Sequence, residues 1–316
     1  MTRSVSTKVS LTILSIILSA LSTQSAFSAI RTWDGGGATN NWSEAANWTG
    51  DVVPEINDSV IFNSTSSKSC TIDVTFVAGV NSLSSTTLDA GYAGTVSFAT
   101  GLSTTFFGQL VINGGIFALS DGDFVHGVFG EFITQNGGTF NTSSGTADLR
   151  LLFLNGGSFN GSTGPIDLDG GIFINNGTFN ASGGLNTFAT NASQNFQQTG
   201  GIFNGNGTVD INGVFQLTGG TFNASPGNTR FSAGFVHSTG GTFNHQNGTV
   251  IFDNPDDRVA TVTTNGNREI FNNVAFLLGS NTTVFNFANP VIFQVNGQLE
   301  MINGVVNSSF PSSTTN

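Results

Sequence analysis

The chain is poor in charge and almost lacks cysteine and tyrosine. Its 316 residues include 8 Lys and Arg, 19 Asp and Glu, 1 Cys and 1 Tyr. The single cysteine, Cys70, has no second cysteine to pair with, which excludes a framework of intramolecular disulfides. The formal net charge of −11 excludes a basic surface that could neutralise phosphates, so we expect no nucleic acid partner.

Glycine, phenylalanine and small polar residues dominate what is present. The sequence contains 42 Gly and 30 Phe, and only 9% of its residues are charged. A disordered chain would be richer in charge and poorer in large apolar residues, and a helical chain would be rich in Ala, Leu, Glu, Lys and Arg. Because Phe and Thr favour strands while Gly and Asn favour turns, the composition predicts an all-β protein.

Residues 1–29 have the layout of a secretory signal peptide. Arg3 and Lys8 begin the segment, an apolar run follows over residues 11–21, and small residues come next. The apolar run is shorter than the roughly 20 residues of a membrane-spanning helix, so we expect cleavage near residues 26–29 rather than an uncleaved anchor. The mature chain is then exported, to the extracellular space or an outer surface, and we expect it to contain no transmembrane segment.

The phrase Gly-Gly-x-Phe-Asn recurs through the middle of the chain. Its Phe positions are separated by 23, 19, 20, 24, 19 and 21 residues, a mean of 21. A Gly-Thr-Val-like phrase keeps the same interval, and so does a second series of Phe residues: Phe132, Phe153, Phe173, Phe196, Phe215 and Phe235. Each unit therefore contains three short strands separated by turns.

One such unit is too small to bury an apolar face alone, so the units are expected to stack. The sequence predicts a right-handed parallel β-helix (a solenoid) with about 21 residues and three short strands in each coil. A left-handed hexapeptide solenoid would need an aliphatic residue at every sixth position, and the chain lacks that pattern.

The alternation of side chains along each strand assigns inner and outer positions. The Phe of each repeated phrase is expected to point inward, in a structural column of Phe117, Phe140, Phe159, Phe179, Phe203, Phe222 and Phe243. The Asn after each Phe lies at the corner of its coil, where identical amides of successive coils can hydrogen-bond in a ladder. That structural ladder comprises Asn141, Asn160, Asn180, Asn204, Asn223 and Asn244.

These patterns divide the chain into a signal peptide (1–29), an N-terminal cap and first coil (30–75), regular coils (76–252), less regular coils (253–308) and a Ser/Thr-rich tail (309–316). Trp33, Trp42 and Trp48 are the only Trp residues and all lie in the cap segment. The open end of a solenoid exposes strand edges and needs a cover, so we interpret the Trp residues as part of the cap. The alternative is a surface-exposed aromatic platform for carbohydrate.

The cap and the coils resemble a known class of protein. Thr-Trp-Asp-Gly-Gly at 32–36, Asn-Trp-Ser at 41–43, Asn-Trp at 47–48 and Pro54 are similar to the start of bacterial autotransporter-associated, filamentous-adhesin-like surface proteins, and the run over 248–307 looks like their repeats. The resemblance implies a right-handed parallel β-helix at the bacterial surface, often in adhesion. Because this chain shows neither the outer-membrane barrel nor the sorting tail of that class, we expect a fragment, a truncated relative or a freely secreted protein.

Outward acidic residues are the candidates for chemistry. Hydrolysis of a glycosidic bond needs two carboxylates at a defined separation, and β-helices also host polysaccharide lyases. Asp148 and Asp167 are 19 residues apart and should stack on the outside of adjacent coils, with Arg150 and Asp169 stacked two residues further on. Like charges opposite each other destabilise a sheet and can mark a cation site. Arg150 can pair with these carboxylates, however, which favours a surface ion-pair cluster.

We therefore expect a secreted or cell-surface, adhesin-like structural protein that presents a repetitive polar surface, with no catalysis, cofactor or metal. Its partners would be surface glycans or matrix components, while the ligand and the oligomeric state are left open. The alternative is a polysaccharide-active lyase or glycoside hydrolase. A third hypothesis, ice or crystal binding by an outward Thr column, is weaker because the column is irregular: Ile116, Thr139, Ser158, Thr178, Ile202, Thr221 and Thr242.

Overall fold

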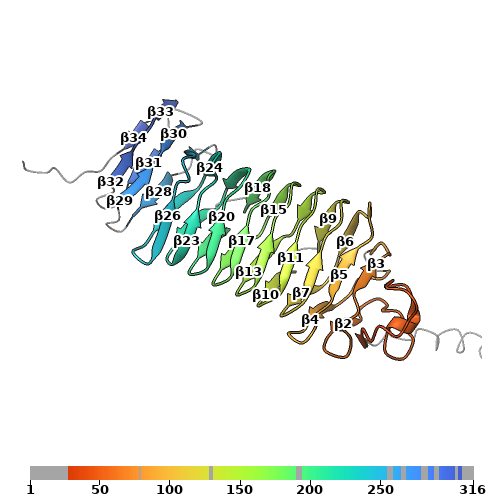
Figure 1. Cartoon of the computed structure of the whole chain (residues 1–316). Helices are drawn as coiled ribbons and strands as arrows, with labels where there is room; N and C mark the ends of the chain where they lie inside the picture. Colours follow the sequence, from red (N-terminus) through yellow and green to blue (C-terminus); the bar gives the residue numbers. More distant parts are fainter. Residues whose placement is uncertain are drawn as a thin grey trace, which may run out of the picture.

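The computed structural model describes residues 28–77, 80–127, 131–189, 194–254, 259–264, 268–278, 284–287, 292–302 and 305–307. These residues form a β-solenoid whose coils follow one another along one long axis (Figure 1). The expected tail, and the expected signal peptide apart from residues 28–29, lie outside the described residues. A single turn of 3-10 helix, η1 (Ala45–Asn47), lies near the N-terminal end of the solenoid.

Three parallel sheets run along the solenoid, and we name them faces A, B and C. Face A has 13 strands: β1 (Ile30–Thr32), β2 (Ser59–Phe62), β4 (Ser85–Leu88), β7 (Gln109–Ile112), β10 (Ile133–Gln135), β13 (Leu151–Leu154), β16 (Gly171–Ile174), β19 (Asn195–Gln198), β22 (Val214–Leu217), β25 (Gly234–His237), β28 (Val259–Thr263), β31 (Val284–Phe287) and β34 (Val305–Asn307). Face B has nine: β3 (Cys70–Ile72), β5 (Thr95–Phe98), β8 (Ile116–Ala118), β11 (Thr139–Asn141), β14 (Ser158–Asn160), β17 (Thr178–Asn180), β20 (Ile202–Asn204), β23 (Gly220–Asn223) and β26 (Gly241–Asn244).

Face C has ten strands: β6 (Thr104–Phe106), β9 (Phe124–His126), β12 (Ala147–Asp148), β15 (Ile166–Leu168), β18 (Leu185–Phe188), β21 (Thr208–Ile211), β24 (Asn228–Phe231), β27 (Thr249–Asn254), β30 (Asn273–Leu278) and β33 (Leu299–Ile302). A fourth sheet pairs β29 (Arg268–Phe271) with β32 (Ile292–Val295). From β4 onward the strands follow the order A, B, C, with β29 and β32 in the sequence position of face B. The expected three strands per coil are confirmed.

The register joins equivalent positions of successive coils. Phe140 pairs with Phe117 on one side and with Phe159 on the other, and Phe179 pairs with Phe203. Hydrogen-bonded Asn residues of neighbouring coils are between 19 and 24 residues apart in this region. Over the whole solenoid, however, coils are about 23 residues apart, longer than the expected 21, because coils towards both ends are longer: the register is offset by 29 residues from Ile30 to Ser59, by 26 from Ser59 to Ser85 and by 27 from Gly234 to Thr261.

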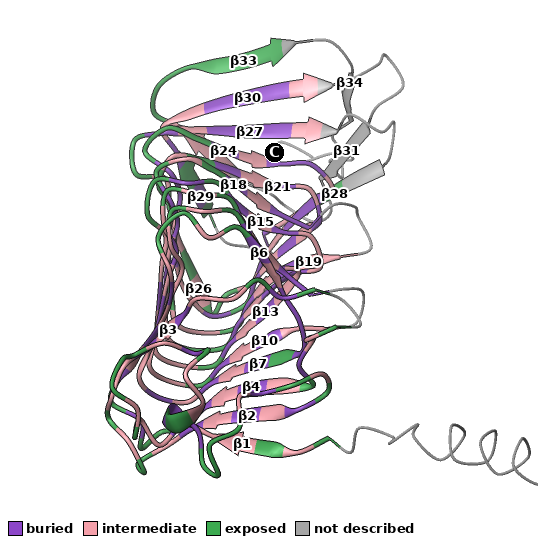
Figure 2. Ribbon diagram, turned by 90° about the vertical axis from the view of Figure 1, so that its right-hand side faces the viewer, coloured by how far each residue is buried: buried purple, intermediate pink, exposed green. Residues whose placement is uncertain are grey.

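Phenylalanine rings fill the interior of the solenoid. Buried and half-buried residues alternate along the strands (Figure 2), as in β14 and β17, where the Phe is buried between two half-buried neighbours. Phe159 and Phe179 stack with ring centroids 4.5 Å apart, and Phe203 and Phe222 with centroids 4.6 Å apart. Six residues of the expected column are completely buried: Phe117, Phe140, Phe159, Phe179, Phe203 and Phe222.

Phe243 departs from that expectation, because it is only partly buried. It stacks on Phe222 at 5.5 Å, but β26 is the last strand of its sheet. On the other side Phe271 of β29 meets it edge-on at 5.6 Å, and among the described residues no parallel ring continues the stack. The column therefore ends at this coil.

Glycine at the corner before face B permits the close approach of neighbouring coils. Gly157 has φ = +74°, a left-handed conformation that is strained for other residues. A Cβ atom on Gly157 would lie 2.4 Å from the carbonyl oxygen of Gly138 in the preceding coil. The second Gly of the repeated phrase is thus required by the backbone conformation and by the spacing between coils.

The second Phe series is split between the inside and the outside, contrary to its regular spacing. Phe196, Phe215 and Phe235 are fully buried. Phe153 and Phe173 instead face outward and are half-buried, because their strands turn Leu and Ile residues inward on either side of the Phe. The two outward rings stack with centroids 5.0 Å apart.

The N-terminal cap buries all three Trp residues. Trp33, Trp42 and Trp48 are at most 1% exposed, and Trp48 meets the other two edge-on at 5.1 and 4.6 Å. Their rings also contact Phe62 of the first coils. The Trp48 indole N–H donates to the Trp42 carbonyl at 2.7 Å and that of Trp33 to the Lys68 carbonyl at 2.9 Å. The alternative of a surface-exposed carbohydrate platform is therefore wrong: these rings pack inside the cap.

The two Phe environments give a matched test of the fold. We expect Phe179→Ala to lower the free energy of unfolding by about 3–5 kcal/mol, because it removes a fully buried ring and leaves a cavity. The neighbouring outward substitution Phe173→Ala should lower it by only about 1 kcal/mol, the scale of one partly exposed aromatic pair. Urea titration followed by circular dichroism measures both, and equal losses would contradict the inward assignment.

Candidate functional site

Asparagine side chains form a continuous hydrogen-bonded ladder beside face B. The Nδ2 of Asn160 donates to Oδ1 of Asn141 at 2.9 Å, and Asn180 donates to Asn160 at 2.8 Å. Asn204, Asn223 and Asn244 continue the series with bonds of 2.7, 2.7 and 2.8 Å. The expected Asn ladder is therefore present in full. Each amide inside it still has one N–H and one acceptor lone pair outside the ladder.

A second ladder, which the sequence reasoning missed, flanks the other side of face B. Asn136 donates to Asn113, Asn155 to Asn136 and Asn175 to Asn155, at 2.8 to 2.9 Å. The Thr199 hydroxyl extends it with a 3.0 Å bond to Asn175. The signal was available in the sequence, because Asn113, Asn136 and Asn155 each precede a Gly-Gly pair.

Together the two ladders border a strip of outward residues. Thr139, Ser158 and Thr178 lie opposite one another in the register of β11, β14 and β17, and all three are half-buried on the outside of the sheet. We call the two Asn ladders and the outward strip between them the amide face. It offers uncharged donors and acceptors, repeated once per coil, which suit a hydroxyl-rich ligand that has its own repeat.

Face C carries the expected acidic residues. Asp148 pairs in register with Asp167, and both are half-buried. Arg150 Nη1 lies 2.9 Å from Asp169 Oδ2, so the expected ion pair forms. Arg150 adopts φ = +59°, at the turn that follows Leu149. One carboxylate oxygen of Asp148 and one of Asp167 is buried and has no hydrogen-bond partner among the described residues.

The surroundings of this cluster disfavour the ionised form of its carboxyl groups. Burial and the neighbouring charges of Asp169 and Asp148 raise the pKa of Asp167 to about 6. Burial also raises the pKa of Asp148, and the Arg150 charge offsets this only in part. A carboxylic acid with a pKa near 6 can donate a proton close to neutral pH, as a general acid does.

A second acidic group on the same face was not singled out from the sequence. Asp210 lies beside Arg230 in register, and Arg230 Nη1 is 3.0 Å from Asp253 Oδ2 of the next coil. Burial raises the pKa values of both Asp210 and Asp253. Both acidic groups are arranged in the same way. An arginine pairs with a carboxylate of a neighbouring coil, and a second carboxylate lies beside that arginine.

Face A carries the outward aromatic stack. Phe132 meets Phe153 edge-on at 5.6 Å, and Phe153 stacks on Phe173. Because the planes of Phe153 and Phe173 are only 16° apart and follow one another along the solenoid, each ring covers the face of its neighbour. These two rings each cover one face of the other, which leaves less open ring surface for a sugar.

Three further buried groups belong to the core. Burial lowers the pKa of His126 to about 4, and its Nε2 lies 3.0 Å from the Gly108 carbonyl oxygen. His237 contacts Glu269, and this contact raises the His237 pKa although burial alone would lower it. Burial raises the pKa of the Cys70 thiol well above its usual value, which disfavours the reactive thiolate.

Across the described ranges, no group of three or more His, Cys, Asp and Glu side chains is placed to hold a metal ion. Within the same ranges, no helix has the length and apolar character needed to cross a membrane. Comparisons with protein-family models, curated proteins and solved structures find no match for this chain.

The Asn ladder can be tested at its centre. Asn180→Ala removes the bonds to Asn160 and Asn204 and leaves one acceptor and one donor without their ladder partners. We expect it to lower the free energy of unfolding by about 1–2 kcal/mol, as for two neutral hydrogen bonds. Exposed Asn206→Ala, in the turn after β20 of the next coil, is the control. Chemical denaturation measures both, and an unchanged midpoint for Asn180→Ala would show that the ladder does not stabilise the solenoid.

The raised pKa of Asp167 predicts how stability depends on pH. Because folded Asp167 holds its proton up to about pH 6, whereas the unfolded carboxyl ionises near pH 4, its contribution to stability falls as pH rises through this window. We expect Asp167→Asn to melt above the parent protein at pH 7, with the difference disappearing below pH 4. Thr187→Asn, the next position in the same outward column, leaves the charge unchanged and is the control. Parallel pH profiles for Asp167→Asn and the parent would contradict the assignment.

Proposed function

We propose that this protein is exported and acts as a non-catalytic, adhesin-like structural protein of the cell surface or extracellular matrix. In this role the amide face contacts surface glycans or matrix components. The observation that supports this proposal is the pair of Asn ladders, which hold uncharged amides in fixed rows along the solenoid.

The physical argument concerns order and charge. The ladders fix each amide in place before a ligand arrives, so binding loses less side-chain entropy than binding to free side chains would. A neutral surface also avoids the free-energy cost of removing water from carboxylates that a bound glycan would cover. Weak contacts repeated along many coils can add up to useful binding by multivalency. A long repetitive ligand therefore suits the amide face better than a small molecule does.

Binding to arrayed glycans, matrix proteins and whole cells tests this proposal. We expect Thr139→Lys combined with Thr178→Lys, which places two long charged side chains on the amide face, to weaken binding at least about tenfold, equivalent to about 1.4 kcal/mol. Thr105→Lys with Thr187→Lys changes two outward Thr residues of face C instead and should leave binding intact. Absence of binding to all three ligand classes, or equal loss in both double variants, would reject the proposal.

A second candidate function, a polysaccharide-active lyase or hydrolase, rests on the raised pKa of Asp167 beside Asp148 and Asp169. Incubation with a panel of polysaccharides, read out by reducing ends and unsaturated products, tests it. An enzyme at this site should produce new ends, and Asp167→Asn should abolish them. The pairing of Arg150 with Asp169 favours the structural interpretation, so we expect no products from the panel.

A further inference from the structure

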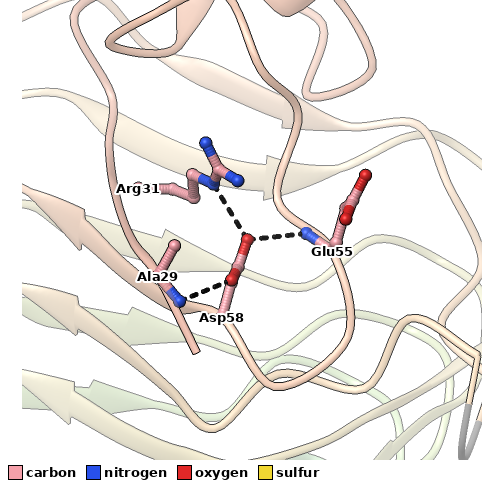
Figure 3. A network of polar contacts seen from close by, with 4 residues as sticks. All are labelled: Ala29, Arg31, Glu55 and Asp58. Atoms are coloured by element: carbon pink, nitrogen blue, oxygen red, sulfur yellow. Dashed lines mark hydrogen bonds and ion pairs between the residues drawn. The ribbon is translucent and has the colours of Figure 1, made fainter. Parts of the chain in front are cut away.

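The described chain begins beside a buried carboxylate. Asp58 is 3% exposed and lies just before β2. Its Oδ1 accepts a hydrogen bond from the Ala29 backbone N–H at 2.8 Å, and its Oδ2 accepts bonds from Arg31 Nε at 2.9 Å and from the Glu55 backbone N–H at 3.0 Å (Figure 3). Asp58 therefore anchors the chain at Ala29, one residue before β1.

Both backbone polar groups of Ala29, its N–H and its C=O, are hydrogen-bonded. Its carbonyl oxygen accepts the Ser59 N–H at 2.8 Å, which extends the pairing of β1 with β2 by one residue. Ala29 is thus the first described residue whose backbone is bonded to the sheet, whereas Ser28, immediately before it, is exposed.

The sequence places a cleavage signal at the Ser28–Ala29 bond. Signal peptides end in small residues at the last position and at the third from last, the A-x-A pattern. Ala26-Phe27-Ser28 fits this pattern if cleavage follows Ser28. Cleavage after Ala29 would place the large Phe27 at the third position from the end, which does not fit.

We propose that processing during export hydrolyses the Ser28–Ala29 bond, and that the new α-ammonium group of Ala29 forms an ion pair with Asp58 as the cap folds. This inference rests on the proposed export of the protein. A leader peptidase would add one water across the peptide bond, leaving a carboxylate on Ser28 and an amine on Ala29 that takes up a proton. In the folded cap the Ala29 N–H of the scissile bond is hydrogen-bonded to Asp58, so we expect the cut to precede folding of the cap.

The ion pair would strengthen a contact that already exists. The bond from the neutral Ala29 N–H to the ionised Asp58 is already charge-assisted, and an ammonium in place of the amide N–H would add the opposite charge and make it an ion pair. Hydrogen bonds from Glu55 N–H, Arg31 and Ala29 N–H hold the pKa of Asp58 below its ordinary value in spite of burial, so the carboxylate is charged at neutral pH. Arg31 Nε bonds to the other oxygen and leaves Oδ1 to the new terminus.

The first experiment determines the N-terminus of the product exported from a bacterial secretion host by mass spectrometry and terminal sequencing. The expected terminus is Ala29. An exported product that begins elsewhere overturns this inference and leaves the proposed export standing. A product that stays inside the cell with residues 1–28 attached overturns both.

The second experiment tests the ion pair without depending on export. Proteins that begin at Ala29 or at Ser28 are purified, and the α-amine is labelled with an amine-reactive ester at pH 7. An ion pair that raises the α-amine pKa by about one unit leaves about tenfold less free amine. We therefore expect the Ala29 protein to react about tenfold more slowly than the Ser28 protein, whose amine lies one residue beyond Asp58.

Asp58→Asn in the protein beginning at Ala29 should restore fast labelling, because the amide keeps the shape of the side chain and removes its charge. If this variant does not fold, the comparison between the proteins that begin at Ala29 and at Ser28 still tests the ion pair, since both retain Asp58. Equal labelling rates for those two proteins would overturn the proposed ion pair.

Discussion

Packing of each side chain against the equivalent position of the neighbouring coil is the constraint on which this structure depends. Parallel pairing places equivalent positions of successive coils about 4.8 Å apart, which favours residues that pack well against a copy of themselves. Phe rings satisfy this by stacking inside, as Phe159 does on Phe179. Asn side chains satisfy it at the corners, because an amide both donates and accepts, as in the bond from Asn160 to Asn141.

The same constraint explains the scarcity of charge. Carboxylates stacked one coil apart repel each other and are partly desolvated, as the raised pKa values of Asp148 and Asp167 show. The chain limits this penalty by placing Arg150 against Asp169 and Arg230 against Asp253. A solenoid that exposed ladders of charge would need such a partner in every coil, whereas ladders of Asn need none.

Most of the fold could be predicted because its signals repeat. The Phe column and the first Asn ladder follow from one phrase at a regular interval, and the structure places both where the spacing requires. The second Phe series could not be resolved in this way, because the strand around Phe153 is apolar at every position. Alternation of apolar and polar residues therefore does not indicate which side chains point inward. In the structure the Leu side chains on either side of Phe153 pack inward and Phe153 points outward. The cap Trp residues have no repeat, so their burial rested on the need to close the end.

Repetition also limits where recognition can reside. On a surface that presents the same group in every coil, a ligand with a matching repeat makes the same contact again in the next coil. Its affinity therefore grows with its length. The outward parallel stack of Phe153 and Phe173 does not serve in this way, since it joins only two rings. The acidic cluster is likewise confined to a few coils, and one of its carboxylates, that of Asp169, is paired with Arg150. The Asn ladders combine length and neutrality with hydrogen-bonding capacity outside the ladders, and this combination favours the amide face as the proposed contact surface.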